Sequence, residues 1–372
     1  MPEMKNPPSK TFCSRPWNDV FLVNKGYSPC CMIKKTEFGS YQDYLSSDYL
    51  KSIKKSLLAG ERHSACKTCW EQEDSKVWSN RVALEVEDFD NPKVLYAGID
   101  FSNTCNLACQ MCGPYLSTSW GKRLNKRDGS KIQVWNTLSD PRKKLEFYNE
   151  ILPNLLQLGM SGGEPFQSPD NLELLKIAPR INRKLSLFYN SNVTNLYFKG
   201  EYIPKYFKNF LNVTVAASVD GYGLANDYQR LNSKWDVVEK NMLEIKEYVN
   251  YIHATPTIYT LFSLGDLIQW GIDHEIPVEV YMVNRGPLHP TILPREIKIQ
   301  YIETMIKRFR AYPHILKSLK EVFFKSILQE TSNKEEWTIA FKKQTIINNK
   351  EAPIQFPDFA PELKEWYNSI LL

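Results

Sequence analysis

The feature that most constrains this chain is a short loop with three cysteines, Cys105, Cys109 and Cys112, directly after the apolar residues 94–101. Consecutive cysteines are separated by three and then two residues, so that all three thiolates can bind one inorganic centre. Three ligands from one loop leave a metal position open to a substrate or cofactor, which is typical of a reactive site. The spacing alone is also compatible with a zinc loop, or with three cysteines that are simply buried.

All eight cysteines fall within the first 112 residues of this 372-residue chain. A disulfide framework would leave most of so long a chain without cross-links, whereas clustered thiols in a reducing compartment indicate metal binding. No apolar segment approaches the roughly 20 residues of a membrane span, and the N-terminus lacks the apolar core of a signal peptide. We therefore expect a cytoplasmic protein without a membrane partner. The net charge of +5 gives no strong case for a nucleic-acid partner and does not exclude one.

The first 70 residues predict a small α+β segment that carries the remaining cysteines. Residues 20–23 form an expected strand, and a turn at 24–26 leads into a second strand that ends at Cys30 and Cys31. The next segment has helical periodicity up to Gly60, the expected C-cap. The residues expected to share one face of this helix are Leu50, Ile53, Leu57 and Leu58.

A C-x2-C pair follows this helix and completes a set of four thiols that can bind a metal. The four are Cys13, Cys30, Cys66 and Cys69. Cys30 and Cys31 compete for one of these positions. Zinc and an iron–sulfur cluster are both chemically suitable, and from these residues alone zinc is favoured because structural four-cysteine zinc sites are common.

The rest of the chain alternates strand and helix, which predicts an α/β fold with parallel strands. The expected strands are residues 94–101, 155–160, 185–190, 212–218, 253–260 and 277–283. Six such units fall short of the eight of a complete TIM barrel. Beyond residue 291 the apolar residues recur at helical spacing, which predicts a helical cover. We therefore expect a cysteine-rich domain at 1–90, a strand–helix domain at 91–290 and a helical extension at 291–372.

Polar motifs lie at the ends of several expected strands, where βα-barrel proteins keep their chemistry. Gly162, Gly163 and Glu164 end the second strand. Two adjacent glycines allow close backbone approach and unusual dihedral angles, and the carboxylate can accept a hydrogen bond from an ammonium group. The alternative is an ordinary Gly-Gly turn.

The next two strands end in Asn190 and in Ser218 with Asp220. Ser218 and Asp220 are two residues apart and face the same side of a strand, as binding of a ribose diol would require. The alternative for this pair is an Asp-Gly turn. Arg230 follows ten residues after Asp220, and its alternative is a surface helix arginine.

Together these motifs resemble the radical S-adenosylmethionine (SAM) superfamily over residues 94 to about 290. In that family C-x3-C-x2-C follows the first strand of a partial (βα)6 TIM-like barrel, whose open side admits a substrate. The resemblance implies a [4Fe–4S] cluster on Cys105, Cys109 and Cys112, with an open iron that chelates SAM. An external electron donor such as flavodoxin or ferredoxin would reduce it. The resemblance assigns the SAM adenine to Met111, the amino group to Gly162, Gly163 and Glu164, the carboxylate to Arg230 and the ribose to Ser218 and Asp220, with Asn190 in a partly matching position.

The cysteines between residues 12 and 90 resemble the twitch/SPASM-type auxiliary-cluster modules of radical SAM enzymes. The matching patterns are C-x2-PW, G-x2-PCC and C-x2-CW-x2-E. Here the module precedes the barrel, whereas in better-known members it follows. The resemblance implies an auxiliary iron–sulfur cluster, of the [4Fe–4S] type, on Cys13, Cys30, Cys66 and Cys69, with Cys30 in the Pro-Cys position.

The resemblance implies an oxidoreductase or maturase-type enzyme that cleaves SAM to a 5′-deoxyadenosyl radical and abstracts hydrogen from a substrate. A peptide or protein substrate is expected because such modules are most often paired with one, and a small sugar or nucleotide is the alternative. Two other classes stay open. One is a zinc-bearing binding protein, and the other is a cluster-binding electron-transfer or assembly protein without SAM chemistry.

Overall fold

The computed structural model describes residues 8–24, 26–33, 36–74, 79–81, 93–283 and 286–371. The chain divides into two compact units, each built from segments that are distant in the sequence. The first unit comprises Met1–Thr104, Gln133–Asn190 and Tyr197–Thr214, and the second comprises Cys105–Ile132, Ser191–Leu196 and Val215–Leu372. The three domains expected from the sequence stay predictions, and their boundary at residue 90 lies outside the described residues.

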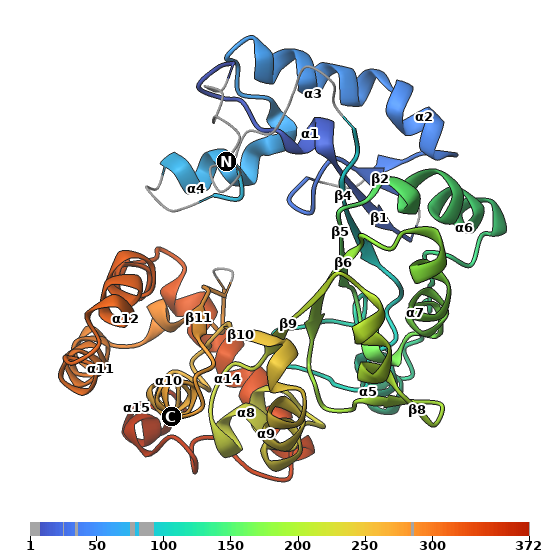
Figure 1. The fold of residues 1–372 in the computed structure, drawn as a ribbon. Coiled ribbons are helices and arrows are strands. Elements are labelled where there is room, and N and C mark those ends of the chain that lie inside the picture. Colours follow the sequence, from blue (N-terminus) through green and yellow to red (C-terminus); the bar gives the residue numbers. More distant parts are fainter. Residues whose placement is uncertain are drawn as a thin grey trace. The chain divides into compact units, whose positions relative to one another are not determined.

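The first unit contains strands in the order β3-β2-β1-β4-β5-β6 (Figure 1). Strands β4, β5 and β6 pair in parallel, as βα units require. The predicted N-terminal hairpin is confirmed, since β1 and β2 pair antiparallel, and β1 also pairs in parallel with β4. The strands are β1 (Asp19–Val23), β2 (Gly26–Ser28), β3 (Thr36–Glu37), β4 (Tyr96–Asp100), β5 (Gln157–Ser161) and β6 (Ser186–Ser191), and a separate β7 (Tyr197–Phe198) pairs with β8 (Glu201–Tyr202).

Helix α3 (Asp48–Leu58) anchors the N-terminal segment through one apolar face. Leu50, Ile53 and Leu57 are buried on that face, whereas Leu58 is 41% exposed. The expectation that Leu58 shares the face is wrong, because consecutive helical residues project in different directions. Gly60 has a φ of +79°, as a glycine that terminates a helix requires. The other helical elements of this unit are α1 (Arg15–Asn18), α2 (Tyr41–Ser46), η1 (Ser64–Cys66), α4 (Lys67–Asp74), α6 (Pro141–Glu146), η2 (Phe147–Ile151), η3 (Leu152–Asn154), η4 (Pro165–Gln167), α7 (Pro169–Ile181) and η5 (Ile203–Asn209).

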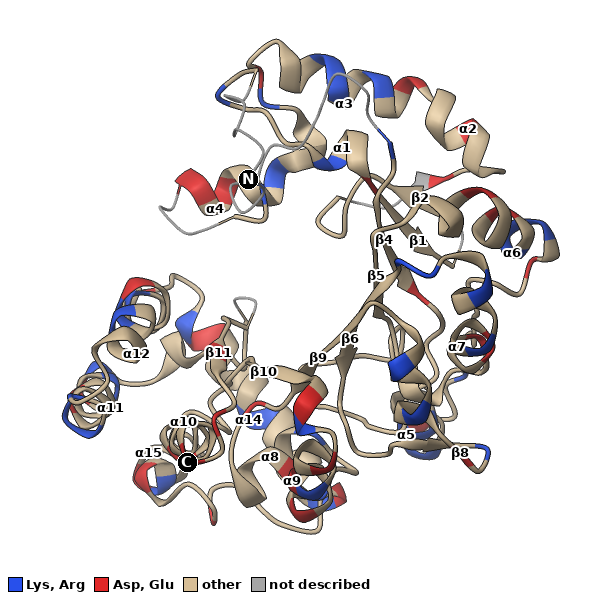
Figure 2. Ribbon diagram, viewed as in Figure 1, with Lys and Arg blue, Asp and Glu red and all other residues tan. Residues whose placement is uncertain are grey.

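The second unit contains the end of β9 (Asn212–Ser218), β10 (Val249–Ala254) and β11 (Val278–Val280), which pair in parallel. The expected strand at 253–260 is wrong in its position. Residues after Ala254 instead form a turn, in which the N–H of Thr257 donates to the hydroxyl of Thr260 at 3.0 Å. Figure 2 shows that β5, β6, β9 and β10 carry no charged residue, whereas charges cover the helices.

Helices make up most of the rest of the second unit. In the C-terminal region Phe341 is fully buried and packs on the ring of Tyr259, with 5.3 Å between the centroids. Among the described helices, none combines the length and hydropathy that a membrane span needs. The helical elements are α5 (Thr118–Asp128), α8 (Gly223–Gln229), α9 (Trp235–Glu244), η6 (Lys246–Tyr248), α10 (Leu264–Asp273), η7 (Pro290–Ile292), α11 (Arg295–Arg308), α12 (Pro313–Ser318), η8 (Leu319–Phe324), α13 (Lys325–Leu328), α14 (Lys334–Glu351), η9 (Pro361–Leu363) and α15 (Lys364–Leu371).

The observed fold is therefore mixed α/β with mostly parallel strands, as the sequence predicts. The partial barrel stays a prediction.

Candidate functional site

The three-cysteine loop is held on one side by the first turn of α5. The carbonyl of Cys105 accepts from the hydroxyl of Ser119 at 2.8 Å, and that of Leu107 accepts from Ser117 at 2.6 Å. The carbonyl of Cys109 accepts from the indole N–H of Trp120 at 2.8 Å. Alternate carbonyls of the loop are thus bound by side chains of one helix start, which fixes the loop's path.

The opposite side of the loop is bound by the backbone around Arg230. The N–H of Ala108 donates to the carbonyl of Leu231 at 3.0 Å, and that of Gln110 donates to the carbonyl of Gln229 at 2.7 Å. These bonds flank Arg230, whose Nη1 lies 4.0 Å from Sγ of Cys109. The loop and Arg230 are therefore positioned as one element.

The three thiols lie close enough to influence one another. Burial raises the pKa of Cys109 to about 12, Arg230 opposes this, and the thiols of Cys105 and Cys112 raise that pKa further. The N–H of Leu107 lies 3.4 Å from Sγ of Cys105. Burial thus disfavours a free thiolate at Cys109, and only Arg230 opposes this. Charges and N–H donors beside cysteine sulfurs are typical of the ligands of iron–sulfur clusters.

Arg230 and Asp220 form a buried ion pair. Nε of Arg230 lies 2.7 Å from Oδ2 of Asp220, and Nη2 lies 3.0 Å from Oδ1. Arg230 is 8% exposed and Asp220 is fully buried, which excludes a surface helix arginine. The N–H of Thr255 also donates to Oδ1 at 2.9 Å. Burial lowers the pKa of Arg230, but Asp220 outweighs this and holds the pKa above its usual value.

Met111 and Ser218 lie in the same unit as the cysteine loop. The side-chain amide of Gln229 lies 3.1 Å from the sulfur of Met111, which gives this methionine a defined position. Ser218 is half-buried at the end of β9 and pairs in register with His253 of β10. In turn His253 pairs in register with Glu279 of β11.

His253, near the end of β10, is a polar residue of this region that was not predicted from the sequence. Its ring lies over Tyr281, with 4.0 Å between centroids, and the hydroxyl of Tyr281 donates to Glu279 at 2.6 Å. Burial lowers the pKa of His253, Arg230 lowers it too, and Asp220 and Glu279 oppose them. The sequence predicted a strand that begins at residue 253, which put His253 at the start of the strand. In the structure it lies near the end of β10 (Val249–Ala254).

The Gly162–Glu164 motif lies in the first unit and packs on the residues that precede Cys105. The N–H groups of Gly163 and Glu164 donate to the carbonyls of Ser102 and Thr104, each at 2.8 Å. A Cβ on Gly163 would lie 2.1 Å from the oxygen of Thr104, so only glycine fits. Gly162 has a φ of +106°. The carboxylate of Glu164 accepts from the N–H of Phe166 at 3.0 Å and is 4% exposed.

Asn190 lines a cavity of about 510 Å³ in the first unit. Aromatic walls come from Phe21 and Phe188, and Cys30 and Cys31 line the same cavity. The volume is within the range of about 300–1,000 Å³ that small-molecule pockets occupy.

Three of the four N-terminal thiols pack on the core of the cysteine-rich segment. Cys13, Cys30 and Cys66 contact a buried cluster that includes Trp17 and Trp70, and Cys69 is 7% exposed. Burial raises the pKa of Cys13 to about 11 and that of Cys30 and Cys66 to about 12. Neighbouring thiols raise these pKa values further, since Cys13 acts on both Cys30 and Cys66.

Cys31 is placed differently from this group. It is exposed, and the amide of Asn80 lies 3.8 Å from its sulfur. The packing therefore favours Cys30 over Cys31 as the fourth thiol. All eight cysteines lie in described residues, and none of them forms a disulfide.

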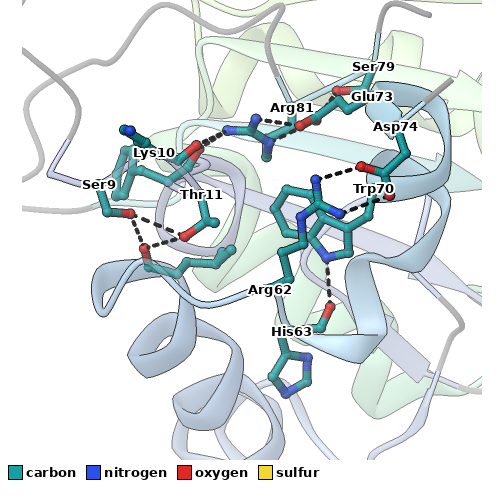
Figure 3. Close-up of polar contacts among 12 residues, drawn as sticks. Ser9, Lys10, Thr11, Arg62, His63, Trp70, Glu73, Asp74, Ser79 and Arg81 are labelled. Atoms are coloured by element: carbon teal, nitrogen blue, oxygen red, sulfur yellow. Dashed lines mark hydrogen bonds and ion pairs between the residues drawn. The ribbon is translucent and has the colours of Figure 1, made fainter. Parts of the chain in front are cut away.

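Two arginines lie near the ring of Trp70, which directly follows Cys69, and Figure 3 draws all three side chains. The guanidinium carbons of Arg62 and Arg81 lie 5.4 and 5.1 Å from its ring centroid. Arg81 also pairs with Glu73 at 2.6 Å and donates to the carbonyl of Phe12 at 2.9 Å, as Figure 3 shows for the ion pair. Arg81 thereby ties the C-x2-C pair to the residue before Cys13.

Within the described residues, no group of three or more His, Cys, Asp or Glu side chains has a ready-made metal-binding geometry. Both ligand sets therefore stay predictions that rest on spacing and packing.

No family model matches this chain, and no curated protein matches it. Among solved structures it is similar to SuiB of Streptococcus suis, which was solved with S-adenosylmethionine and with the precursor peptide SuiA. The SAM-bound structure is 14% identical with a TM-score of 0.40, and covers 83% of this chain and 75% of SuiB. The structure with the precursor peptide SuiA is 12% identical with a TM-score of 0.37, and covers 80% and 73%.

Proposed function

We propose that this protein is a radical SAM enzyme that cleaves SAM reductively and abstracts hydrogen from a peptide or protein side chain. The observation that supports this best is the loop at 105–112. Its three thiols influence one another electrostatically, it is held on both sides by hydrogen bonds, and Arg230 lies 4.0 Å from Cys109. Such a fixed donor set fits a three-thiolate iron–sulfur site with one iron left open.

A [4Fe–4S] cluster on these thiols would supply the electron that cleaves the sulfonium of SAM. The protein's part is to bind and orient. Arg230 offsets the negative charge of the thiolates. Asp220 pairs with Nε and Nη2 of its guanidinium, whereas Nη1 lies on the side of Cys109 and has further N–H donors. We assign the SAM carboxylate to this remaining edge of Arg230.

The other contacts with SAM follow from the placement of each residue. We assign the amino group to the motif of Gly162, Gly163 and Glu164, because the carboxylate of Glu164 is buried and a contact with an ammonium group is strong in such surroundings. Ser218 binds the ribose. Asp220 instead positions Arg230, because its carboxylate oxygens are bound by Arg230 and by the N–H of Thr255.

We also propose that Cys13, Cys30, Cys66 and Cys69 hold an auxiliary iron–sulfur cluster. Cys13, Cys30 and Cys66 pack on the cluster with Trp17 and Trp70, and Cys69 acts electrostatically on Cys13 and Cys66, which supports this assignment. A fully ligated auxiliary cluster has no open iron, so it would accept an electron from the substrate, and the reaction would be an oxidation such as dehydrogenation or cross-linking. A peptide substrate fits such a reaction.

The test is anaerobic reconstitution with iron and sulfide, followed by addition of SAM and dithionite without substrate. We expect 5′-deoxyadenosine to form. The triple variant Cys105→Ala/Cys109→Ala/Cys112→Ala should lose about half of the iron and all of this product. Cys31→Ala is the matched control and should keep both. A protein with full iron content that forms no 5′-deoxyadenosine would instead be a cluster-binding electron-transfer or assembly protein.

A further inference from the structure

Strand β11 ends the series of strands in the second unit. It pairs with β10 through the N–H of Ile252, which donates to the carbonyl of Pro277 at 2.8 Å, and the N–H of Tyr281, which donates to the carbonyl of Ala254 at 2.8 Å. In a parallel ladder the inward-bonding residues alternate with residues whose backbone groups point to the other edge. Those are Val278 and Val280. Among the described residues, nothing pairs with that edge of β11.

A cavity of about 390 Å³ lies directly beside this edge. Val278 and Val280 form one wall, α10 contributes Ile272, and α12 contributes Ile315 on the opposite wall. The cavity is mainly aliphatic. A Cβ on Gly271 of α10 would lie 2.7 Å from the side chain of Val278, so α10 packs closely on β11 at this point. Figure 1 shows α12 on the side of β11 away from β10.

The open edge of β11 and the cavity beside it can be filled by the same ligand. A row of outward N–H and C=O groups binds an extended backbone, and such an added strand projects every second side chain to the face of Val278 and Val280. A ligand without a backbone would satisfy only the cavity. We propose that the edge of β11 and the cavity beside it, which we name the β11–α12 groove, bind an extended peptide segment with an aliphatic side chain in the cavity.

The opposite face of β11 connects this groove to the site already described. Glu279 lies in register with His253, which lies in register with Ser218. The remaining side chains of an added strand would project to that face. A peptide in the groove would be separated from β9, which carries Ser218, by strands β11 and β10. A role of the groove in binding the substrate rests on the proposed function, whereas the binding of a peptide to the groove does not.

The probe is a fluorescein-labelled synthetic peptide of alternating serine and leucine, titrated by anisotropy into the reconstituted full-length protein. Val280→Pro removes one outward N–H at an edge position that tolerates proline. Ile315→Lys places a charge in the cavity and leaves the backbone of β11 intact. Ile339→Lys is the matched control, because Ile339 is an isoleucine on α14 that is 48% exposed. A peptide with N-methylated leucine and serine amides removes the backbone donors from the ligand.

We expect saturable binding that weakens about tenfold in Val280→Pro and Ile315→Lys and for the N-methylated peptide, and that is unchanged in Ile339→Lys. Thermal unfolding checks that Val280→Pro folds, and Ile315→Lys decides the question if it does not. No saturable binding, or equal binding by Ile315→Lys, overturns the proposal. So does a wild-type dimer that Val280→Pro dissociates, since a second copy would then occupy the edge. Formation of 5′-deoxyadenosine without peptide, measured on the same samples, reports on the proposed function separately.

Discussion

Arg230 and Asp220 form a buried ion pair joined at two points, with 2.7 Å between Nε and Oδ2 and 3.0 Å between Nη2 and Oδ1. The resemblance to radical SAM enzymes implied separate contacts with SAM for these two residues. In the structure each one fixes the other, and Arg230 reaches Cys109 only because Asp220 holds the other edge of its guanidinium. Any change to Asp220 should therefore act on the cysteine loop as well.

Asp220→Asn should lower the free energy of unfolding by about 3 kcal/mol or more, because it leaves a buried guanidinium without its counter-charge. Arg230→Met should cost a similar amount by leaving the carboxylate of Asp220 buried and unpaired. Chemical denaturation of the protein without cluster measures both. The double variant Asp220→Asn/Arg230→Met removes both charges and should be more stable than the sum of the single changes implies. Additive losses would show that the pair contributes no mutual stabilisation.

The local features of the site could be predicted from the sequence, because they depend on neighbouring residues. The cysteine spacing placed the three thiols of the 105–112 loop on one turn of chain, and the Gly162–Gly163 pair was expected where close backbone approach is now seen. The N-terminal hairpin followed from its turn residues. The cysteine spacing and the hairpin depend on near neighbours in the sequence, whereas the residue that Gly163 approaches, Thr104, is distant and could not be named from the sequence.

The features that were missed depend on contacts between distant residues. Strand β1 pairs in parallel with β4, and nothing in residues 19–23 specifies that partner. Residues 255–260 look like a strand because they are rich in threonine, but Gln229 accepts a hydrogen bond from Thr260 at 3.1 Å and fixes them as a turn. The strand consequently ends at Ala254. His253 thereby reaches the functional end of β10, which periodicity alone could not show.

Glu164 has a structural as well as a proposed binding role, and two substitutions separate them. Glu164→Gln keeps an oxygen that can accept from the N–H of Phe166 but loses the charge. It should weaken SAM binding by about 1.5–3 kcal/mol and leave the thermal stability nearly unchanged. Glu164→Ala also removes the cap of η4 and should cost about 1 kcal/mol of stability in addition. Equilibrium dialysis with labelled SAM measures the affinity, and equal SAM affinity in Glu164→Gln and wild type would rule out the ammonium contact.

Asp227 should make the protein less stable as the pH rises from about 4 to 6. Burial raises the pKa of Asp227 from 3.8 to about 6, although Lys234 and the backbone at Trp235 oppose this. Within the described residues, its Oδ1 has no hydrogen-bond partner. In this window the unfolded chain has already lost the proton that the folded one retains. Because the group is only half-buried, we expect a loss of about 1 kcal/mol.

Asp227→Asn should remove that pH dependence and stabilise the protein by about 1 kcal/mol at pH 7. Urea unfolding at pH 4, 5, 6 and 7 compares the two proteins. A variant whose stability falls with pH as steeply as that of wild type would assign the effect to another carboxylate.

The last prediction concerns Cys30 and Cys31, which are adjacent in the sequence but placed differently. Cys30 packs beside Cys13 and Cys66, whereas Cys31 is exposed. Cys31→Ala should therefore keep about eight irons per chain, as two four-iron clusters. Cys30→Ala should keep about four, with the EPR signal of one reduced cluster lost. Both variants should still form 5′-deoxyadenosine, because neither residue belongs to the 105–112 loop. If Cys31→Ala loses iron and Cys30→Ala does not, Cys31 is the ligand in place of Cys30. Loss of SAM cleavage in Cys30→Ala would mean that the two cysteine sets do not act as separable centres, since the 105–112 loop would then depend on a ligand from the other unit.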